Sequence, residues 1–270
     1  MIAYLARRIV FGAAVLVGAS IITFLIAFVI PADPAVTMAG AKADPQTLAS
    51  IRHEMGLDLP LYVQYARYLD RAVHGDLGRS YVRRESVSAL IAARLPATAI
   101  LAVTAMALSL MIGIAMGLLS AAYRGRAADN ILLVTSLSFV SIPIFWLGTM
   151  FLVAAALWLH GLPLGGYGGA RSLILPAITL ALGSAGYYSR ILHTNLSDAL
   201  DQDYIRTARG KGVSRAAVML KHAMANAMLP LVTIAGLDFA GLLSGVVLTE
   251  TVFDWPGIGR LAEEAIFNLD

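Results

Sequence analysis

Long runs of hydrophobic residues dominate the chain. Five of them are long enough for a helix to cross a membrane, which takes roughly 20 residues, and they cover residues 9–30, 97–120, 131–159, 172–193 and 227–249. Because lipid offers the backbone no hydrogen-bond partners, helices are the expected form of such spans. The pattern therefore predicts an all-α protein that crosses the membrane several times.

The composition agrees with a membrane protein. Hydrophobic residues make up 59% of the 270 residues and charged residues only 14%, whereas a soluble domain is about half apolar and about a quarter charged. The net charge of +3 comes from arginine and lysine at the ends of loops, as is usual in membrane proteins. It is therefore no indication of nucleic-acid binding.

Arginine and lysine are distributed unevenly between the apolar runs. With the N-terminus inside, the short cytoplasmic segments carry Arg7, Arg8, Arg124, Arg126, Arg190, Arg206, Arg209, Lys211, Arg215 and Lys221. The short outer segments then hold only Arg171 and Arg260. Because cytoplasmic loops are enriched in these residues, the distribution predicts a cytoplasmic N-terminus.

The first apolar run follows a positively charged start, as it would in a signal peptide. It is about twice as long as the apolar part of a signal peptide, and no cleavage site ends it cleanly. Residues 1–30 are therefore expected to hold a retained first span, and residues 96–270 to form the transmembrane core.

Residues 31–95 are expected to form an extracytoplasmic segment with two helices. Pro45 and Gly56 are typical of the start and the end of the first helix. The second, from Leu61, has apolar residues at spacings of three and four. It either lies on the outer membrane surface or packs on the spans.

The polar segment 203–226 separates the last two apolar runs. It holds Arg206, Arg209, Lys211, Arg215 and Lys221 but only one acid, Asp203. The pattern predicts two short amphipathic helices joined at a turn from Gly210 to Gly212. Ser214 is expected to cap the second helix, on which Val218, Met219 and His222 would share a face. The Gly-Lys pair lacks the neighbours of a phosphate-binding loop, which argues against a nucleotide site.

Proline and glycine mark special points within the apolar runs. Pro143 predicts a kink in the third run, because proline removes a backbone donor. Two Gly-x-x-x-Gly pairs, Gly113 with Gly117 and Gly241 with Gly245, would let helices approach closely. We interpret these pairs as packing features rather than functional ones.

Asp238 is an isolated carboxylate within the last apolar run. A carboxylate near the middle of a membrane is costly, so it normally faces a cavity or a partner. One hypothesis is that Asp238 lines a translocation pathway and favours a cationic amine on the substrate. The alternative is a structural hydrogen bond to a partner subunit.

The sequence offers no basis for catalysis or metal binding by this chain. It contains no cysteine, which excludes disulfides and thiolate ligands. The five histidines are scattered without metal-ligand spacing. The serines that lie in or near the spans have no catalytic partners in the pattern, so we expect no covalent catalysis.

Several long motifs, in order, resemble the inner-membrane permease subunits of ATP-binding-cassette peptide importers. The polar segment DYIRTARGKGVSRAAVMLKHAMANAMLPLVT and the later ETVFDWPGIGRL are similar to that family, as is GDLGRS at residues 75–80. The resemblance is greatest to the first-type permease of the dipeptide, oligopeptide and nickel group. It extends over most of the chain.

The resemblance implies the type I importer permease fold, with five spans here and a sixth expected beyond Asp270. The alternative is a variant of the family with five spans. It also implies that residues 194–226 contain the loop that docks into the ATPase subunit. By position, Arg206, Thr207 and Ala208 occupy the family's Glu-Ala-Ala sites, with Gly212 as the motif glycine. Arg206 is a departure from the family glutamate. The residues implied in coupling are Tyr204, Arg206, Thr207, Ala208, Arg209, Lys211, Gly212 and His222.

The resemblance further implies a complex in a bacterial inner membrane. A second permease, two cytoplasmic ATPase subunits and an extracytoplasmic substrate-binding protein would be partners, and ATP and Mg would bind to the ATPases rather than to this chain. Contacts with the binding protein are implied for Asp76, Glu250, Asp254 and Trp255. The competing function, a secondary transporter or channel, would need internal repeats and several intramembrane charges. The third functional class considered is a membrane-embedded hydrolase, which would need a Ser/His or metal site that the sequence does not show.

Overall fold

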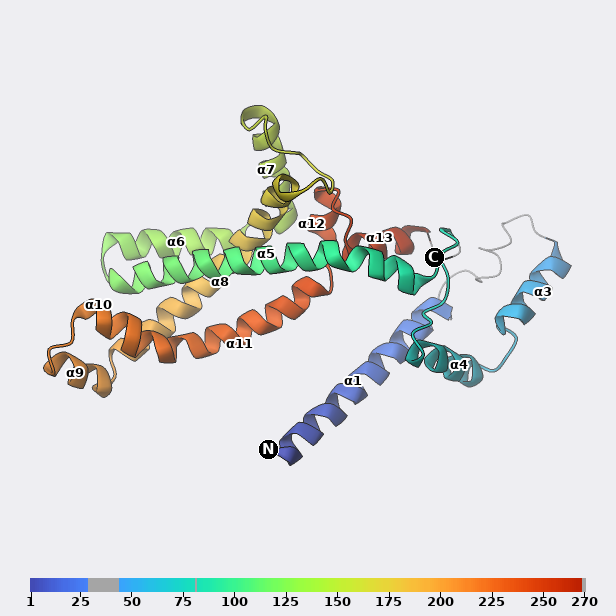
Figure 1. The fold of residues 1–270 in the computed structure, drawn as a ribbon, viewed down its shortest axis with the longest axis horizontal. Helices are drawn as coiled ribbons and strands as arrows, with labels where there is room; N and C mark the ends of the chain where they lie inside the picture. Colours follow the sequence, from blue (N-terminus) through green and yellow to red (C-terminus); the bar gives the residue numbers. More distant parts are fainter. Residues whose placement is uncertain (29–43, 81, 269–270) are drawn as a thin grey trace. The chain divides into compact units, whose positions relative to one another are not determined.

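The computed structural model describes residues 1–28, 44–80 and 82–268. These residues form helices and connecting turns, and the only bridge of β type among them pairs Arg79 with Ser86. The expected all-α class is therefore confirmed. The chain divides into two compact units, residues 1–92 with 265–270 and residues 93–264. Figure 1 labels the helices of both.

The first unit holds the helices α1 (Ile2–Phe28), α3 (Pro45–Met55) and α4 (Leu61–Val73). The side chain of Asp44 caps α3 by accepting a hydrogen bond of 2.8 Å from the backbone N–H of Thr47. Gly56 ends α3 in the left-handed region, at φ 67°, which glycine adopts at low cost. Both ends of this helix match the sequence prediction.

Helix α4 packs against α1 through aromatic side chains. The ring of Tyr65 meets that of Phe24 edge-on at a centroid distance of 5.4 Å, and Tyr68 lies 5.9 Å from the same ring. The hydroxyl groups of Tyr65 and Ser20 are 2.8 Å apart. Of the two interpretations of this amphipathic helix, the contacts favour packing on the first span.

The second unit contains most of the remaining helices. Helix α5 begins a few residues before this unit starts at residue 93, and α13 continues a few residues past its end at residue 264. In chain order the helices are α5 (Val87–Ala122), α6 (Ala127–Ser141), α7 (Ile144–Trp158), α8 (Ala170–Leu200), α9 (Asp203–Gly210), α10 (Arg215–Ala217), the π-helix η1 (Val218–Ala223), α11 (Met224–Leu243), α12 (Val247–Val252) and α13 (Ile258–Asn268).

Helix α8 is the centre of this unit, and α5, α6, α7 and α11 lie against it. The approach is close wherever a glycine faces a neighbouring backbone. A Cβ atom on Gly113 of α5 would lie 3.0 Å from the carbonyl oxygen of Ala185, and one on Gly117 would lie 2.7 Å from that of Ser189. The first predicted Gly-x-x-x-Gly pair therefore does bring two helices together.

Three helices among the described residues are long and apolar enough to cross a membrane, namely Ala3–Ile26 within α1, α5, and the continuous helix Arg215–Leu243. Helices α6 and α7 meet at Pro143 with a bend of 101°, and together they count as a fourth candidate. The predicted kink is thus a sharp break. Helix α8 covers the predicted span 172–193 but is less apolar, so the expected number of five spans stays a prediction.

Burial explains why α8 is less apolar than a helix that faces lipid. Its buried residues include Ser172, Thr179, Ser189 and Ser197. The hydroxyl of Ser136 on α6 donates to that of Ser189 over 3.1 Å. A helix enclosed by other helices can carry polar side chains that hydrogen-bond to its neighbours.

We predict that Gly186→Ala destabilises the protein. A Cβ atom there would lie 2.5 Å from the carbonyl oxygen of Ser136, and a backbone atom has no rotamer by which to retreat. The expected loss is about 1–3 kcal/mol, measured as a lower midpoint of thermal unfolding in detergent. Gly236→Ala is the matched control, because a Cβ on Gly236 meets nothing within 4 Å. Equal midpoints for the two variants would contradict the close packing of α6 on α8.

Candidate functional site

Helix α9 is an eight-residue helix attached to the core of the second unit by one face. Ile205 is fully buried and Ala208 almost so, and both belong to the same hydrophobic cluster as Leu196 and Val218. The hydroxyl of Tyr204 accepts a hydrogen bond of 3.1 Å from the side-chain amide of Asn226 on α11. The first of the two predicted amphipathic helices thus packs its apolar face against the C-terminal end of α8 and the start of the helix that follows.

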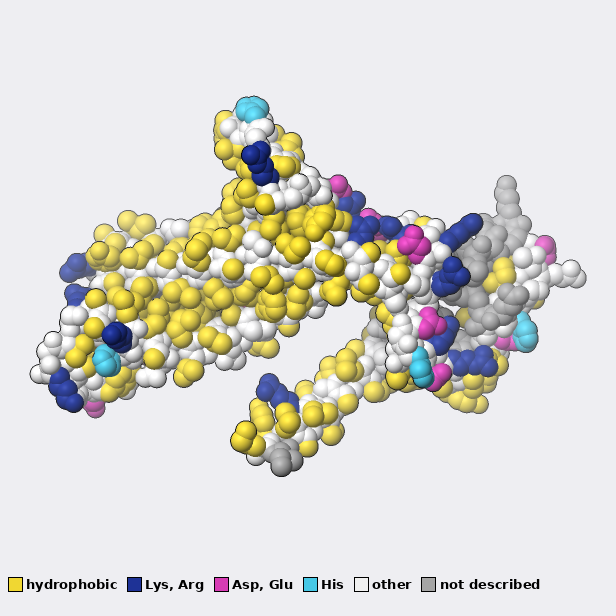
Figure 2. Space-filling view, viewed as in Figure 1, with side chains coloured by type: hydrophobic (Ala, Val, Ile, Leu, Met, Phe, Trp, Pro, Cys, Tyr) yellow, Lys and Arg dark blue, Asp and Glu magenta, His cyan; other side chains and the backbone are white. Residues whose placement is uncertain are grey.

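The opposite face of α9 is exposed and positively charged. Arg206, Thr207 and Arg209 are exposed there, and Lys211 follows directly after the helix. The guanidinium of Arg206 lies 3.2 Å from the carboxylate of Asp203, within the same helix. Figure 2 shows Lys and Arg side chains gathered at the end of the unit where α9 and α10 lie, and mainly hydrophobic side chains along the long helices.

The turn after α9 has the predicted features. Gly212 has φ 80°, which strains residues with a Cβ atom. The backbone N–H of Val213 donates to the carbonyl of Ala208 over 3.2 Å. The hydroxyl of Ser214 accepts from the N–H of Ala217 over 3.4 Å, so the expected N-cap is confirmed.

The second helix of this segment is not a separate element. Helices α10, η1 and α11 form one continuous helix from Arg215 to Leu243. The π-helix in its first part inserts one extra residue per turn. The buried positions therefore run from Val218 to Ala223, a step of five, and continue in steps of four to Ala227 and beyond.

This shift corrects the expectation for His222, which is exposed rather than on the face of Val218. Helices occupy both ends of the segment 194–226, which is expected to contain the coupling loop. Residues 194–200 belong to α8, and residues 224–226 belong to α11. The segment that projects from the long helices is residues 201–214, with α9 at its centre.

Glu250 lies in α12 and is fully buried. One carboxylate oxygen accepts from the hydroxyl of Thr98 on α5 over 2.9 Å, and the other accepts from the backbone N–H of Arg260 over 2.8 Å. The oxygen of Thr98 in turn accepts from the N–H of Ile258 over 2.8 Å. A single carboxylate therefore joins α5, α12 and α13.

Glycines make room for this carboxylate. A Cβ atom on Gly257 would collide with the side chain of Glu250. Gly245, at φ 98°, lies directly against the backbone of Gly259. Gly241, its partner in the second predicted Gly-x-x-x-Gly pair, faces open space. Among the described residues this second pair therefore does not bring two helices together. Gly245 serves the turn after α11, and Gly241 contacts no other helix.

Trp255 is also buried, and its indole N–H donates to the carbonyl of Ala97 over 3.0 Å. The side chains of Glu250 and Trp255 are thus inside the unit, which corrects the expectation that they touch another protein. Asp254 is the exposed member of the turn and pairs with Arg260, which also binds Glu264 over 3.0 Å. Burial disfavours the charged form of Arg260, but these two carboxylates outweigh it and raise the pKa of Arg260.

Asp76 lies in the first unit, in the turn after α4. It is exposed, and its carboxylate accepts a hydrogen bond of 2.9 Å from the backbone N–H of Gly78. Gly78 has φ 88°, so the carboxylate stabilises a turn that glycine makes possible. The structure places Asp76 at the surface of its unit, where a contact with another protein is sterically open.

Asp238 is half-buried on α11. The hydroxyl of Tyr188, a fully buried residue of α8, donates to one of its carboxylate oxygens over 2.8 Å. The other oxygen has no partner among the described residues. The carboxylate therefore has a donor within its own chain, which the sequence could not show, and one oxygen remains available.

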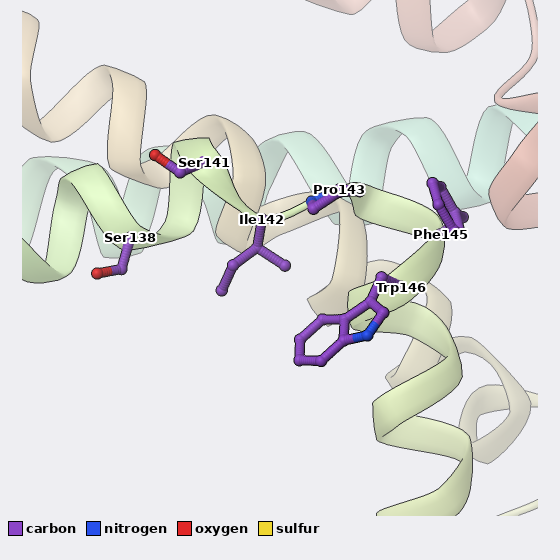
Figure 3. Close-up of a pocket in the computed structure, with 6 residues that line it drawn as sticks. All are labelled: Ser138, Ser141, Ile142, Pro143, Phe145 and Trp146. Atoms are coloured by element: carbon purple, nitrogen blue, oxygen red, sulfur yellow. The ribbon is translucent and has the colours of Figure 1, made fainter.

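The break between α6 and α7 forms an open hollow of about 550 Å³. Figure 3 shows the side chains that line it, among them the aromatic residues Phe145 and Trp146. The hydroxyl groups of Ser138 and Ser141 donate to carbonyls of their own helix, over 3.0 Å and 2.9 Å. The hollow thus offers apolar surface rather than chemistry, and no cluster of three metal-ligating side chains exists within the described ranges.

The chain matches two families over most of its length. Residues 109–270 match the family described as binding-protein-dependent transport system inner membrane component, and residues 1–102 match the N-terminal region of such membrane components. The matched residues include α9 and the turn around Glu250.

Two relatives and two solved structures illustrate these matches. The glutathione transport system permease protein GsiC of Escherichia coli O6:H1 is 39% identical over 98% of this chain and 87% of its own length. A protein of Brucella abortus (strain 2308), provisionally named a peptide transport system permease, is 40% identical over 100% and 88%.

Among solved structures, an amino acid ABC transporter with histidines is similar with a TM-score of 0.51 at 17% identity, over 66% of this chain and 78% of that one. The methionine transporter MetNI in inward-facing conformations has a TM-score of 0.53 at 17% identity, over 65% and 80%. At this identity the likeness shows a shared fold.

We predict that Glu250→Ala strongly destabilises the protein. Two buried donors, the Thr98 hydroxyl and the Arg260 N–H, would lose their acceptor, at about 1–3 kcal/mol each. Glu250→Gln keeps one acceptor oxygen and is expected to cost less. The midpoint of thermal unfolding should fall in the order wild type, Gln, Ala, whereas Asp70→Ala, at a side chain 77% exposed, should leave it unchanged. An unaltered midpoint for Glu250→Ala would refute the structural role of this carboxylate.

Proposed function

The chain belongs to the family of binding-protein-dependent transport system inner membrane components, and from this membership we propose that it is a permease subunit of an ATP-binding-cassette importer for peptides or peptide-like ligands. The observation that carries the proposal is α9, a helix with one buried face and one exposed basic face. A helix held this firmly can receive force from another protein without unfolding.

In this proposal α9 docks on an ATPase subunit. Two such subunits bind ATP and Mg, and the chain itself performs no hydrolysis. A second permease completes the pathway, and a substrate-binding protein delivers the ligand on the other side of the membrane. The distribution of arginine and lysine supports a cytoplasmic position for α9 and for the N-terminus.

Docking through α9 fits its charge. The side chains of Arg209 and Lys211 are exposed and form no ion pair among the described residues, whereas Arg206 is partly neutralised by Asp203. Such a surface is complementary to an acidic cleft. Gly212 sets the direction in which the chain leaves this surface.

The names of the relatives support a peptide-like ligand, since glutathione is itself a small peptide. Asp238 offers a further argument. Its second carboxylate oxygen is available to a ligand, and the hydrogen bond from Tyr188 holds the group in place. A carboxylate in this setting favours a cationic amine, which the N-terminus of a peptide supplies.

The first test reverses the charge of α9. In the complete transporter, Arg209→Glu with Lys211→Glu should lower transport per ATP hydrolysed by about tenfold or more, because like charges in an interface cost several kcal/mol. Transport and ATPase rates are measured together in proteoliposomes. Arg171→Glu, an exposed arginine at the start of α8, is the control and should keep coupling. Unchanged coupling in the α9 variant would count against docking through this helix.

The second test concerns the ligand. Asp238→Asn should reduce transport of peptides with a free amino terminus by about tenfold or more relative to N-acetylated ones, since hydrogen bonds to charged groups contribute about 1.5–3 kcal/mol. Tyr188→Phe keeps the carboxylate charge and should retain the preference for the amine. If Asp238→Asn transports both kinds of peptide as the wild type does, Asp238 has no part in recognition.

A further inference from the structure

Both ends of the projecting segment around α9 are tied to one short stretch, residues 122–124, at the end of α5. The guanidinium of Arg124 donates to the carboxylate of Asp201, just before α9, over 2.9 Å. Beyond α9, the guanidinium of Arg215 donates to the carbonyl of Ala122 over 3.3 Å. That carbonyl is one that the end of α5 leaves without a helical partner. The entry to α9 and the exit from it thus share one anchor.

Asp129, a buried residue of α6, gives this anchor a defined shape. Its carboxylate accepts hydrogen bonds from the hydroxyl of Ser120 and, over 2.9 Å, from the backbone N–H of Gly125. The ring nitrogen Nδ1 of His193 on α8 lies 3.6 Å from the same carboxylate. The anchor is therefore held between α5, α6 and α8 rather than being a loose turn.

Helix α5 connects this anchor with the carboxylate of Glu250. Thr98, which binds Glu250, lies 24 residues before Ala122 in the same helix, which corresponds to about 36 Å along the axis. The only proline inside α5 is Pro96, which precedes this part. Figure 1 shows α5 extending from the end of the unit with α9 and α10 to the end with α12 and α13.

We propose that the end of α5 is a second element that follows the movement of α9, and that α5 carries this movement to the turn around Glu250. Arg124 and Arg215 act as positioning residues, because they act through Asp201 and Ala122 rather than on ATP or ligand. The proposal rests on the docking role of α9. It adds that the docking event reaches the far end of the unit through one continuous helix.

The proposal combines a weak ion pair, Arg124 with Asp201, and a long helix without a break, α5. An exposed ion pair such as that of Arg124 and Asp201 contributes little to stability, but it favours one separation of the two chain segments that carry it. A helix without a break transmits a displacement at one end to the other, and shear of packed helices is a common form of such movement. Tight contacts of Gly113 and Gly117 with α8 guide α5 between its ends.

The test is a charge swap in the complete transporter, with transport per ATP as the readout. Arg124→Asp places two acids together and should lower this ratio about two- to fivefold, the size expected for one exposed pair. Asp201→Arg alone should do the same. The double variant, which restores the pair in reverse, should return the ratio to the wild-type value.

Arg126→Asp is the matched control, because it makes the same change two residues further along the same turn. The side chain of Arg126 has no partner among the described residues, and its variant should keep the wild-type ratio. A loss in Arg124→Asp that Asp201→Arg fails to repair would show that Arg124 touches another chain directly, which overturns the proposal. An unaltered ratio in Arg124→Asp also overturns it. Neither result affects the docking role of α9, which the reversal at Arg209 and Lys211 tests by itself.

The connection along α5 has its own test. Thr98→Val removes the hydroxyl that binds Glu250, and Thr98→Ser retains it. Thr98→Val should lower transport per ATP, and combining it with Arg124→Asp should lower the ratio no further than the larger single effect, because both act on one helix. Multiplied effects would show two independent routes and overturn the proposal. Thr98→Ser should give the wild-type ratio of transport per ATP. A lower ratio in this variant would also contradict the role of the hydroxyl.

Discussion

A buried carboxylate has to receive hydrogen bonds, and the position of three helices depends on how Glu250 meets this requirement. The cost of an unpaired charge in an apolar interior is large, so Thr98 and the N–H of Arg260 cannot move far from its two oxygens. Glycine at 257 follows from the same constraint, since a side chain there would occupy the space of the carboxylate. The turn that follows α12 is therefore shaped by an internal group, and its outer surface consists of what remains, mainly Asp254.

Packing around α8 is the second constraint. It allows a helix in the centre of the unit to be less apolar than the helices around it. Helices at the lipid boundary need apolar side chains, but a helix with much of its surface packed against other helices, as α8 has, can carry polar side chains that bond to its neighbours. Tyr188 shows the consequence, because its hydroxyl reaches Asp238 on α11 while its ring is fully buried. The same residue meets Gly113 of α5. A polar contact with α11 and a close approach of α5 thus meet at one residue of α8.

Local features of the chain could be predicted from the sequence, and tertiary ones could not. The helix start at Pro45, its end at Gly56 and the cap at Ser214 depend on a few neighbouring residues, so their pattern is sufficient. The burial of Glu250 and Trp255 depends on α5, more than 150 residues earlier in the chain, and a charged or aromatic motif residue gives no sign of it. The π-helix at 218–223 shifts the buried face by one residue, which a period of 3.6 cannot anticipate. Pro143 predicts a bend, but its 101° angle depends on how α7 packs against α8 and α12.

Arg206 stands where the family resemblance places a glutamate, yet α9 is still attached to the core of its unit. The family resemblance places a glutamate at this position, and a lost salt bridge would be one consequence of the arginine. The structure gives Arg206 an acid within its own helix, Asp203, three residues earlier. Such a pair is weak, so the attachment of α9 rests on Ile205 and Ala208 instead. Because these two buried residues attach α9 to the core, side chains on its exposed face can differ between relatives without weakening that attachment. The proposed docking on an ATPase subunit therefore depends on the exposed charges of α9, and a basic face is complementary to an acidic cleft.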